Sequence, residues 1–311
     1  MKQFTKRLAK GLLVLFVILN VIILFHAYKL THFYEAGEIV IKKPADKSGW
    51  DISREILMGA NLAKQKNVAP DSNYKVSSLS TAEGLKLEAW ENTVPRSRGT
   101  VAIFHGHGSK KSSMLQEAAV FSSLGYNTLL LDFRAHGGSE GNTCTIGFYE
   151  AEDIKLVYDH LLAKGEKKII LFGASLGAAT ITKAIRDYSL TPHKVILDMP
   201  FASLSDAVRG RLKIMNLPQE PLSTLLTFWG GTTHGFWAFN HKPSEYVRAI
   251  KCPVLLQRGR RDARVTQEET EKIFSNISSH KKMVIYENSA HESLCKKETM
   301  KWTNEVTAFL Q

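Results

Sequence analysis

From about residue 73 to its end, the chain alternates short apolar stretches with longer amphipathic ones. The apolar stretches predict strands at 100–104, 127–131, 168–172, 194–197, 254–257 and 282–286. Helices are expected between them, near 113–124, 148–163, 176–188, 266–277 and 297–310. A hairpin with strands at 74–79 and 85–90 precedes them. This order predicts an α/β fold with a mostly parallel central sheet that is covered by helices on both faces.

One interval, residues 201–242, interrupts this alternation with prolines, paired glycines and several aromatic residues. We interpret it as a cap that is inserted into the α/β domain. Its aromatic side chains either pack the cap onto the sheet or line an acyl pocket or face a membrane. The aromatic residues that we single out as a candidate substrate pocket are Trp229, Phe236 and Trp237.

The start of the chain has the features of a membrane anchor. Four basic residues within the first ten precede an apolar stretch at 11–28, whose main polar interruption is Asn20. About 20 helical residues cross a bilayer core, and about 17 suffice. The stretch lacks the periodicity of a core helix, and no A-x-A-like processing site follows it, which favours an uncleaved signal anchor over a cleaved signal peptide.

Length and charge complete this organisation. We divide the 311 residues into a basic tail and transmembrane anchor at 1–30, a polar connector at 31–72, and one α/β domain at 73–311 with the cap at about 201–242. Lys43 and Pro44 mark a linker within the connector. Because flanking basic residues stay on the cytoplasmic side, we expect a single-pass protein with a cytoplasmic amino terminus and an extracytoplasmic domain, in a bacterial inner membrane.

The net charge of +11 suggests the bilayer as a partner. Nucleic acid is not expected, since no basic run is interleaved with aromatic residues. Cys144, Cys252 and Cys295 have no CxxC spacing, and both one disulfide and three free thiols agree with the sequence.

A G-x-S-x-G motif, Gly173-Ala174-Ser175-Leu176-Gly177, lies between the expected strand at 168–172 and the helix after it. A serine at such a tight turn has a strained backbone, and its glycine neighbours leave room for it. The hydroxyl would be exposed at the carboxyl edge of the sheet. The motif alone occurs by chance, but its placement between a strand and a helix makes Ser175 the candidate nucleophile.

A serine hydroxyl needs a histidine to take its proton and an acid to orient that histidine, in the chain order Ser, acid, His. Asp262 follows the expected strand at 254–257, and His291 follows the strand at 282–286. Both loops reach the edge of the sheet where Ser175 is expected. The alternatives are a solvated aspartate paired with a neighbouring arginine and a surface histidine.

The loop His105-Gly106-His107-Gly108 follows the expected strand at 100–104. We expect it to supply the backbone N–H of His107 to an oxyanion hole, with the N–H of Leu176 as the second donor. Gly106 and Gly108 let the backbone approach the substrate. An H-x-H pair can also chelate a metal, but further ligands are missing nearby, so no metal and no organic cofactor is expected.

A second turn, at 132–139, contains His136. It precedes the nucleophile in the chain and lies among turn residues. We therefore interpret His136 as part of a structural turn that shapes the pocket floor, and not as the catalytic base.

Over about residues 74–310, the chain resembles the α/β-hydrolase superfamily. The resemblance is carried by the loop at 105–108, the turn at 132–139, the G-x-S-x-G turn, Asp262 and His291, taken in this order. The branch they resemble most contains lysophospholipases, monoacylglycerol lipases and serine aminopeptidases. This resemblance implies a catalytic triad of Ser175, Asp262 and His291, with His107 and Leu176 as oxyanion donors. The chain departs from the family pattern at Ala135, where a glycine is usual, and the cap resembles nothing known to us, so substrate specificity is not transferable.

These observations predict a membrane-anchored serine hydrolase that cleaves a small-molecule acyl substrate, an ester such as a lipid or lysophospholipid ester, through an acyl-serine intermediate. A serine aminopeptidase or a thioesterase would use the same triad. The alternative from another class is a membrane-tethered binding protein that keeps the fold without activity.

Overall fold

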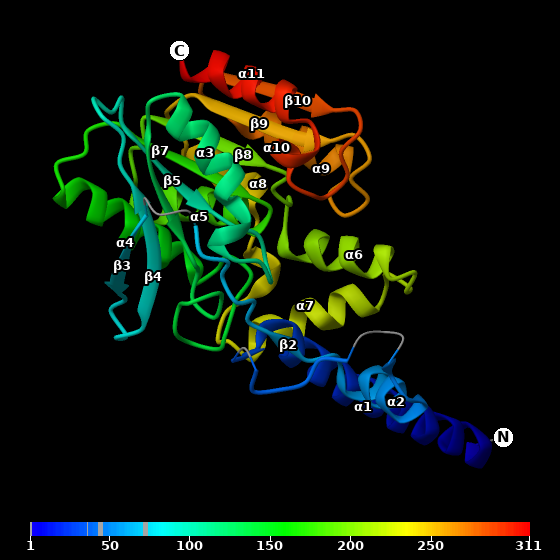
Figure 1. The fold of residues 1–311 in the computed structure, drawn as a ribbon. Helices are drawn as coiled ribbons and strands as arrows, with labels where there is room; N and C mark the ends of the chain where they lie inside the picture. Colours follow the sequence, from blue (N-terminus) through cyan, green and yellow to red (C-terminus); the bar gives the residue numbers. More distant parts are fainter. Residues whose placement is uncertain (1, 36, 43–45, 71–73) are drawn as a thin grey trace.

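The structure is a computed structural model that describes residues 2–35, 37–42, 46–70 and 74–311. Lys43 and Pro44 lie outside the described residues. An eight-stranded sheet forms the centre of the molecule (Figure 1), in the order β10-β9-β8-β7-β5-β6-β4-β3. The strands are β3 (Lys75–Ser80), β4 (Lys86–Asn92), β5 (Thr100–Phe104), β6 (Asn127–Leu131), β7 (Ile169–Ala174), β8 (Lys194–Asp198), β9 (Val254–Gly259) and β10 (Lys281–Tyr286).

The sheet is mostly parallel, as the sequence predicts. Strands β5 to β10 pair in parallel, whereas β3 pairs antiparallel with β4, and β4 pairs antiparallel with β6. Strand β5 is buried at every residue. Its continuous apolar run reflects a strand that is covered on both faces.

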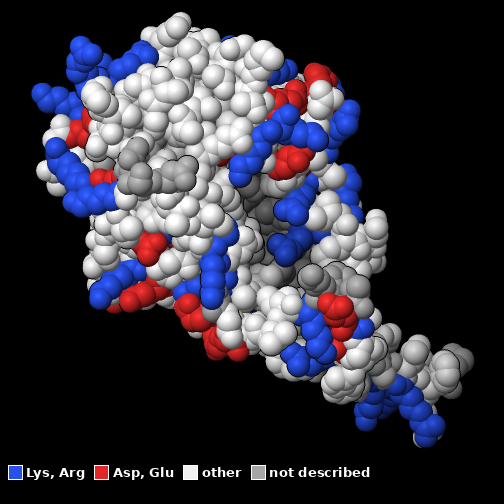
Figure 2. All heavy atoms as spheres, in the orientation of Figure 1, with Lys and Arg blue, Asp and Glu red and all other residues white. Residues whose placement is uncertain are grey.

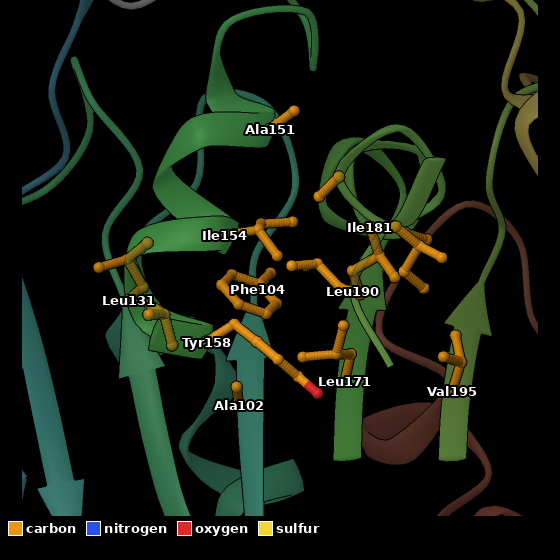
Figure 3. Close-up of a cluster of buried hydrophobic side chains, with 14 of the residues drawn as sticks. Ala102, Phe104, Leu131, Ala151, Ile154, Tyr158, Leu171, Ile181, Leu190 and Val195 are labelled. Atoms are coloured by element: carbon orange, nitrogen blue, oxygen red, sulfur yellow. The ribbon is translucent and has the colours of Figure 1, made fainter. Parts of the chain in front are cut away.

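Helices cover the two faces of the sheet. One face packs on α4 (Glu150–Ala163), α5 (Leu176–Tyr188) and α9 (Gln267–Asn276), and the other on α3 (Leu115–Ser123) and α11 (Thr299–Leu310). Figure 3 shows the first cluster, in which Ile154 of α4 and Ile181 of α5 meet Phe104 and Leu171 from the strands. Shorter helical segments are η2 (Lys111–Met114), α8 (Pro243–Tyr246), η4 (Val247–Ala249) and α10 (Leu294–Lys297).

The interval that interrupts the alternation is helical. It contains α6 (Leu204–Ile214), α7 (Leu222–Thr232) and η3 (Ala238–Asn240). Helices α6 and α7 pack on each other at one side of the sheet (Figure 1).

Helix α1 (Lys2–Thr31) is the one helix among the described residues that is long and apolar enough to cross a membrane. Its residues 2–18 are exposed, whereas its second half packs along α7 (Figure 1). Trp229 Nε1 donates to Asn20 Oδ1 at 3.1 Å, and Thr31 Oγ1 and His234 Nε2 lie 2.9 Å apart. The polar interruption of the apolar stretch therefore meets a partner in the cap.

The described parts of the connector pack against the α/β domain. They form α2 (Gly49–Met58), which lies beside α1, and a two-stranded parallel sheet of β1 (Phe33–Tyr34) and β2 (Leu62–Ala63). Phe33 N–H donates to Asn142 O at 2.7 Å, and Lys64 Nζ donates to Ser139 O at 2.9 Å. The described connector is thus held by the domain at several points.

Candidate active site

Ser175 occupies a tight turn between β7 and α5. Its φ of +52° and ψ of −109° lie in a sparsely populated region for a side chain, which costs about 1–3 kcal/mol. The turn is held by its backbone, since Ser175 N–H donates to Asp198 O at 2.7 Å. The strained turn leaves the side chain partly exposed.

The two glycines of the motif allow α5 to approach the sheet closely. A Cβ at Gly177 would lie 2.3 Å from Phe104 O, and one at Gly173 would lie 2.5 Å from the Gly177 carbonyl carbon. Because these neighbours are backbone atoms, they cannot move aside as a side chain would. Close packing therefore requires glycine at both positions.

The structure brings Ser175, His291 and Asp262 together. Ser175 Oγ lies 2.9 Å from His291 Nε2, and His291 Nδ1 lies 2.7 Å from Asp262 Oδ2. A carboxylate only accepts hydrogen bonds, so Nδ1 carries the ring proton and Nε2 is left to accept from the serine hydroxyl. This is the arrangement in which a histidine can take a proton from serine.

Asp262 is held by its own backbone neighbourhood. Its Oδ1 accepts from Arg264 N–H at 2.8 Å and from Val265 N–H at 2.9 Å. The carboxylate is fully buried, and the His291 side chain is 13% exposed. Asp262 is therefore not the solvated, arginine-paired carboxylate of the alternative interpretation.

The backbone N–H groups of His107 and Leu176 stay unpaired among the described residues, as an oxyanion hole requires. The loop is fixed around them. His136 Nε2 accepts from Gly108 N–H at 3.0 Å, and His107 Nε2 donates to Leu30 O at 3.1 Å. Gly108 has a φ of +67°, whereas a Cβ at Gly106 would lie 3.6 Å from Ser175 Cβ, an ordinary contact. The oxyanion assignment stays a prediction.

The other histidines of these loops are buried and engaged. His136 Nδ1 donates to Arg134 O at 2.9 Å, and His105 Nε2 accepts from Phe133 N–H at 3.2 Å. Burial lowers the pKa of His136 to about 4, so the ring is neutral near pH 7. Through its hydrogen bond with Gly108 N–H, His136 thus stabilises the loop that contains His107, which agrees with its interpretation as part of a structural turn.

Ala135, where the resemblance leads one to expect glycine, has a φ of +63° and is buried. The turn therefore keeps the left-handed conformation that glycine adopts at lower cost. Gly137 in the same turn lies against the buried Asp132 carboxylate, which accepts from Lys111 N–H at 2.6 Å and Gly138 N–H at 2.8 Å.

A cavity of about 550 Å³ lies next to Ser175. Figure 2 shows a hollow bordered by basic side chains between the α/β domain and the cap. Its wall combines apolar surface, such as Met114 and Met199, with polar groups around Ser175 and His291, and its basic members are Arg211, Arg264, Lys296 and Lys297. The charge of this wall was not anticipated from the sequence, because these residues come from three separate stretches of the chain.

The aromatic residues of the cap do not line this cavity. Phe236 stacks on Phe148 with 3.9 Å between ring centroids, Trp229 bonds to Asn20 of α1, and Trp237 is 55% exposed. The structure therefore does not place them where an acyl pocket above Ser175 would need them. They pack the cap onto the domain and onto α1, or face outward.

The cavity wall also contains two carboxyl groups, of Asp198 and Glu117, that the sequence analysis did not identify. Asp198 ends β8 at the edge of the sheet, and Gln257 Nε2 and Trp302 Nε1 donate to it at 2.8 and 3.3 Å. Burial raises the pKa of Asp198 to about 8, and it also raises the pKa of Glu117. The place of Asp198 directly after a strand was the signal that could have identified it.

All three cysteines are free, two of them buried. This settles the choice that the sequence left open in favour of three thiols.

Several known proteins are similar to this chain. Residues 95–232 match the family described as serine aminopeptidase, S33. The chain is 27% identical to YqkD of Bacillus subtilis over 276 residues, which are 88% of this chain and 89% of YqkD. It is 24% identical to the lysophosphatidylserine lipase ABHD12 of Danio rerio over 256 residues, 75% of this chain and 63% of the lipase.

Among solved structures, the esterase Pf2001 of Pyrococcus furiosus aligns with a TM-score of 0.66 at 24% identity, over 81% of this chain and 98% of the esterase. The chain therefore has the α/β-hydrolase fold.

Proposed function

We propose that this protein is a serine hydrolase that cleaves carboxylic esters through an acyl-serine intermediate. The observation that carries the proposal is the hydrogen-bonded chain from Ser175 Oγ through His291 to Asp262, with distances of 2.9 and 2.7 Å. Its support is that the serine lies at a strained turn of a hydrolase fold, beside a cavity large enough for a small acyl substrate.

The reaction follows from these positions. Ser175 Oγ attacks the ester carbonyl carbon while its proton passes to His291 Nε2. The N–H groups of His107 and Leu176 stabilise the oxyanion that forms. Collapse of this intermediate breaks the bond to the alcohol, which leaves with the proton from His291. Water then attacks the acyl-serine with His291 as the base, which releases the carboxylic acid and restores the serine.

The electrostatics of the cavity favour an ester over an aminopeptidase substrate. An aminopeptidase has to hold a free ammonium group close to the scissile bond. Four basic residues line the cavity here, and burial raises the pKa of Glu117 and Asp198 and so favours their neutral forms. The wall therefore repels an ammonium group. The aminopeptidase function keeps the support of the matched family's description, and a thioesterase is served equally by the same residues.

Labelling with a fluorophosphonate probe tests the mechanism. We expect the wild-type protein to be labelled and to hydrolyse 4-nitrophenyl esters, and Ser175→Ala to lose both properties while it keeps its fold, because one partly exposed hydroxyl is removed. Ser113→Ala is the matched control: this serine lines the same cavity, but its Oγ bonds to Ser109 Oγ at 2.6 Å and not to a histidine. Wild-type protein that is not labelled, or an active Ser175→Ala, would contradict the mechanism and favour a tethered binding protein.

We also propose that α1 anchors the protein in a membrane. The stretch at 11–28 is about 27 Å long as a helix, close to the thickness of a bilayer core. Helix α7, which packs along the second half of α1, contains no charged residue. In addition, α2 exposes Trp50, Ile56 and Leu57, at 76, 64 and 53%. These surfaces suit the interface between lipid and water.

A reporter fused after Gln311 tests the orientation that the basic residues before α1 predict. An alkaline phosphatase fusion, which is active outside the cytoplasm, should be active, and a fusion to a cytoplasmic reporter should not. The opposite pattern would reverse the proposed orientation. Release of the protein by carbonate washing, or a mature amino terminus beyond Tyr28, would show that α1 is not an anchor.

A further inference from the structure

The cavity beside Ser175 carries positive charge that the protein does not neutralise. Arg211 comes from cap helix α6, Arg264 from the loop after β9, and Lys296 and Lys297 from α10. Figure 2 shows basic side chains around the hollow at this face. Lys296 Nζ is engaged, since it donates to Ser113 O at 2.6 Å. Arg211 is the least exposed of the four, since Arg264, Lys296 and Lys297 are all exposed.

The Arg211 guanidinium has no hydrogen-bond or ion-pair partner among the described residues, although the residue is only partly exposed. Arg209, two positions earlier on the same helix, pairs with Asp206 at 2.8 Å and with Glu220 at 3.1 Å. Burial, and then the charge of Arg264, lower the pKa of Arg211. A partly desolvated guanidinium next to a second one is unfavourable unless an anion joins them.

The carboxyl groups of the cavity do not supply that anion. Burial favours the neutral forms of Glu117 and Asp198, whose pKa values are raised. Glu292 is exposed and accepts from Ala290 N–H at 3.2 Å. The charge of Arg211 also reaches the ring of His107, whose pKa it helps burial to lower. Arg211 and His107 of the oxyanion loop line the same cavity.

We propose that Arg211, assisted by Arg264, binds a phosphate group on the alcohol portion of the substrate, so that the protein prefers phosphate-bearing esters to neutral ones. This inference rests on the proposed ester hydrolysis. A guanidinium offers paired N–H donors in a plane that fit phosphate oxygens, and such charge-assisted bonds are the stronger ones in proteins. The basic part of the wall then receives the phosphate end of the substrate.

The test compares decanoylglycerol with decanoylglycerol 3-phosphate, which share the same ester and acyl chain, at concentrations below micelle formation. We expect a higher kcat/KM for the phosphate ester in the wild type. Arg211→Gln should reduce that value by about 10- to 100-fold, mainly through KM, and affect hydrolysis of the neutral ester much less. Arg211→Lys should restore part of the loss, and added NaCl should raise KM for the phosphate ester alone.

Arg209→Gln is the matched control, since it removes an arginine from the same helix whose guanidinium is already paired, and it should leave both substrates unaffected. A wild type that cleaves both esters equally well overturns the phosphate site and leaves ester hydrolysis standing. Equal losses on both substrates in Arg211→Gln would show that Arg211 has a structural role, and they also overturn the site.

Binding provides a readout without turnover. Calorimetric titration of Ser175→Ala with decanoylglycerol 3-phosphate should detect binding that Arg211→Gln in the same background weakens. A titration with inorganic phosphate distinguishes a site for the free ion from a site that needs the whole ester. Unchanged binding of the phosphate ester in the double variant would overturn the proposal even if the protein hydrolysed no ester at all.

Discussion

Asp262→Asn is a sharp test of the proposed mechanism, because the structure determines how the new side chain must lie. Two backbone N–H groups, of Arg264 and Val265, point at Oδ1 at 2.8 and 2.9 Å. The asparagine oxygen has to take this position, since an amide NH₂ cannot accept from them. The NH₂ group then faces His291 Nδ1 in place of Oδ2, which lies 2.7 Å away in the native protein.

This geometry selects the wrong tautomer of the histidine. Nδ1 has to become an acceptor, so the ring proton moves to Nε2, which can then no longer take a proton from Ser175. Restoring the active tautomer breaks the bond to the amide and leaves two donors facing each other in a buried site. At about 1–3 kcal/mol for each of the two unpaired groups the cost is about 2–6 kcal/mol, or about 30-fold to 10⁴-fold in rate.

The assay is kcat/KM for a 4-nitrophenyl ester between pH 6 and 9, measured for the wild type, Asp262→Asn and Asp262→Ala. The asparagine variant should unfold at nearly the wild-type temperature, because it still satisfies both backbone donors. The alanine variant should be less stable, because it leaves the buried Val265 N–H unpaired. It should nevertheless be at least as active as the asparagine variant, because it does not force the wrong tautomer.

Asp262→Asn activity within tenfold of the wild type would refute this reasoning. A more active asparagine than alanine variant would also do so, because it would mean that placement of the ring matters more than its tautomer. The labelling rate with a fluorophosphonate should fall in parallel with kcat/KM, since both depend on removal of the serine proton.

Two further predictions concern stability. Burial raises the pKa of Asp198 to about 8 from about 4 in the unfolded chain, so the native state becomes less stable as the pH rises between these values. In urea unfolding, the stability of Asp198→Asn relative to the wild type should therefore increase from pH 5 to pH 8, by up to about 1.4 kcal/mol per pH unit. The same difference in unfolding free energy between variant and wild type at pH 5 and pH 8 would contradict this. Gly177→Ala should lose several kcal/mol of stability through overpacking and a shift of the backbone, because its Cβ would lie 2.3 Å from Phe104 O. Gly230→Ala in α7, with open space at its Cβ, should be neutral or slightly stabilising in thermal unfolding. Similar melting temperatures for the two variants would rule out the close approach at Gly177.

Local pattern was enough to predict the strands of the central sheet, the main helices that alternate with them and the turn at Ser175. The predicted strands at 100–104 and 127–131 coincide with β5 and β6, and the helix predicted after the serine begins at Leu176. Parallel strands with alternating helices leave their carboxyl ends at one edge, so loops that are far apart in sequence meet there. This is why Ser175, Asp262 and His291 could be chosen from their order, and why the structure finds them in contact.

The hydrophobic pattern could not reveal what the long-range packing decides. It did not show where the cap aromatics point: Trp229 contacts α1 and Phe236 stacks on Phe148, and neither lines the cavity. It also did not show that Arg211 and Arg264 line the cavity. That Asp262→Asn would fix the wrong tautomer of the histidine also follows only from the structure, through the backbone donors at 264 and 265. Such features depend on which surfaces of separate segments face one another, and a side chain's own neighbours in the chain carry no record of that.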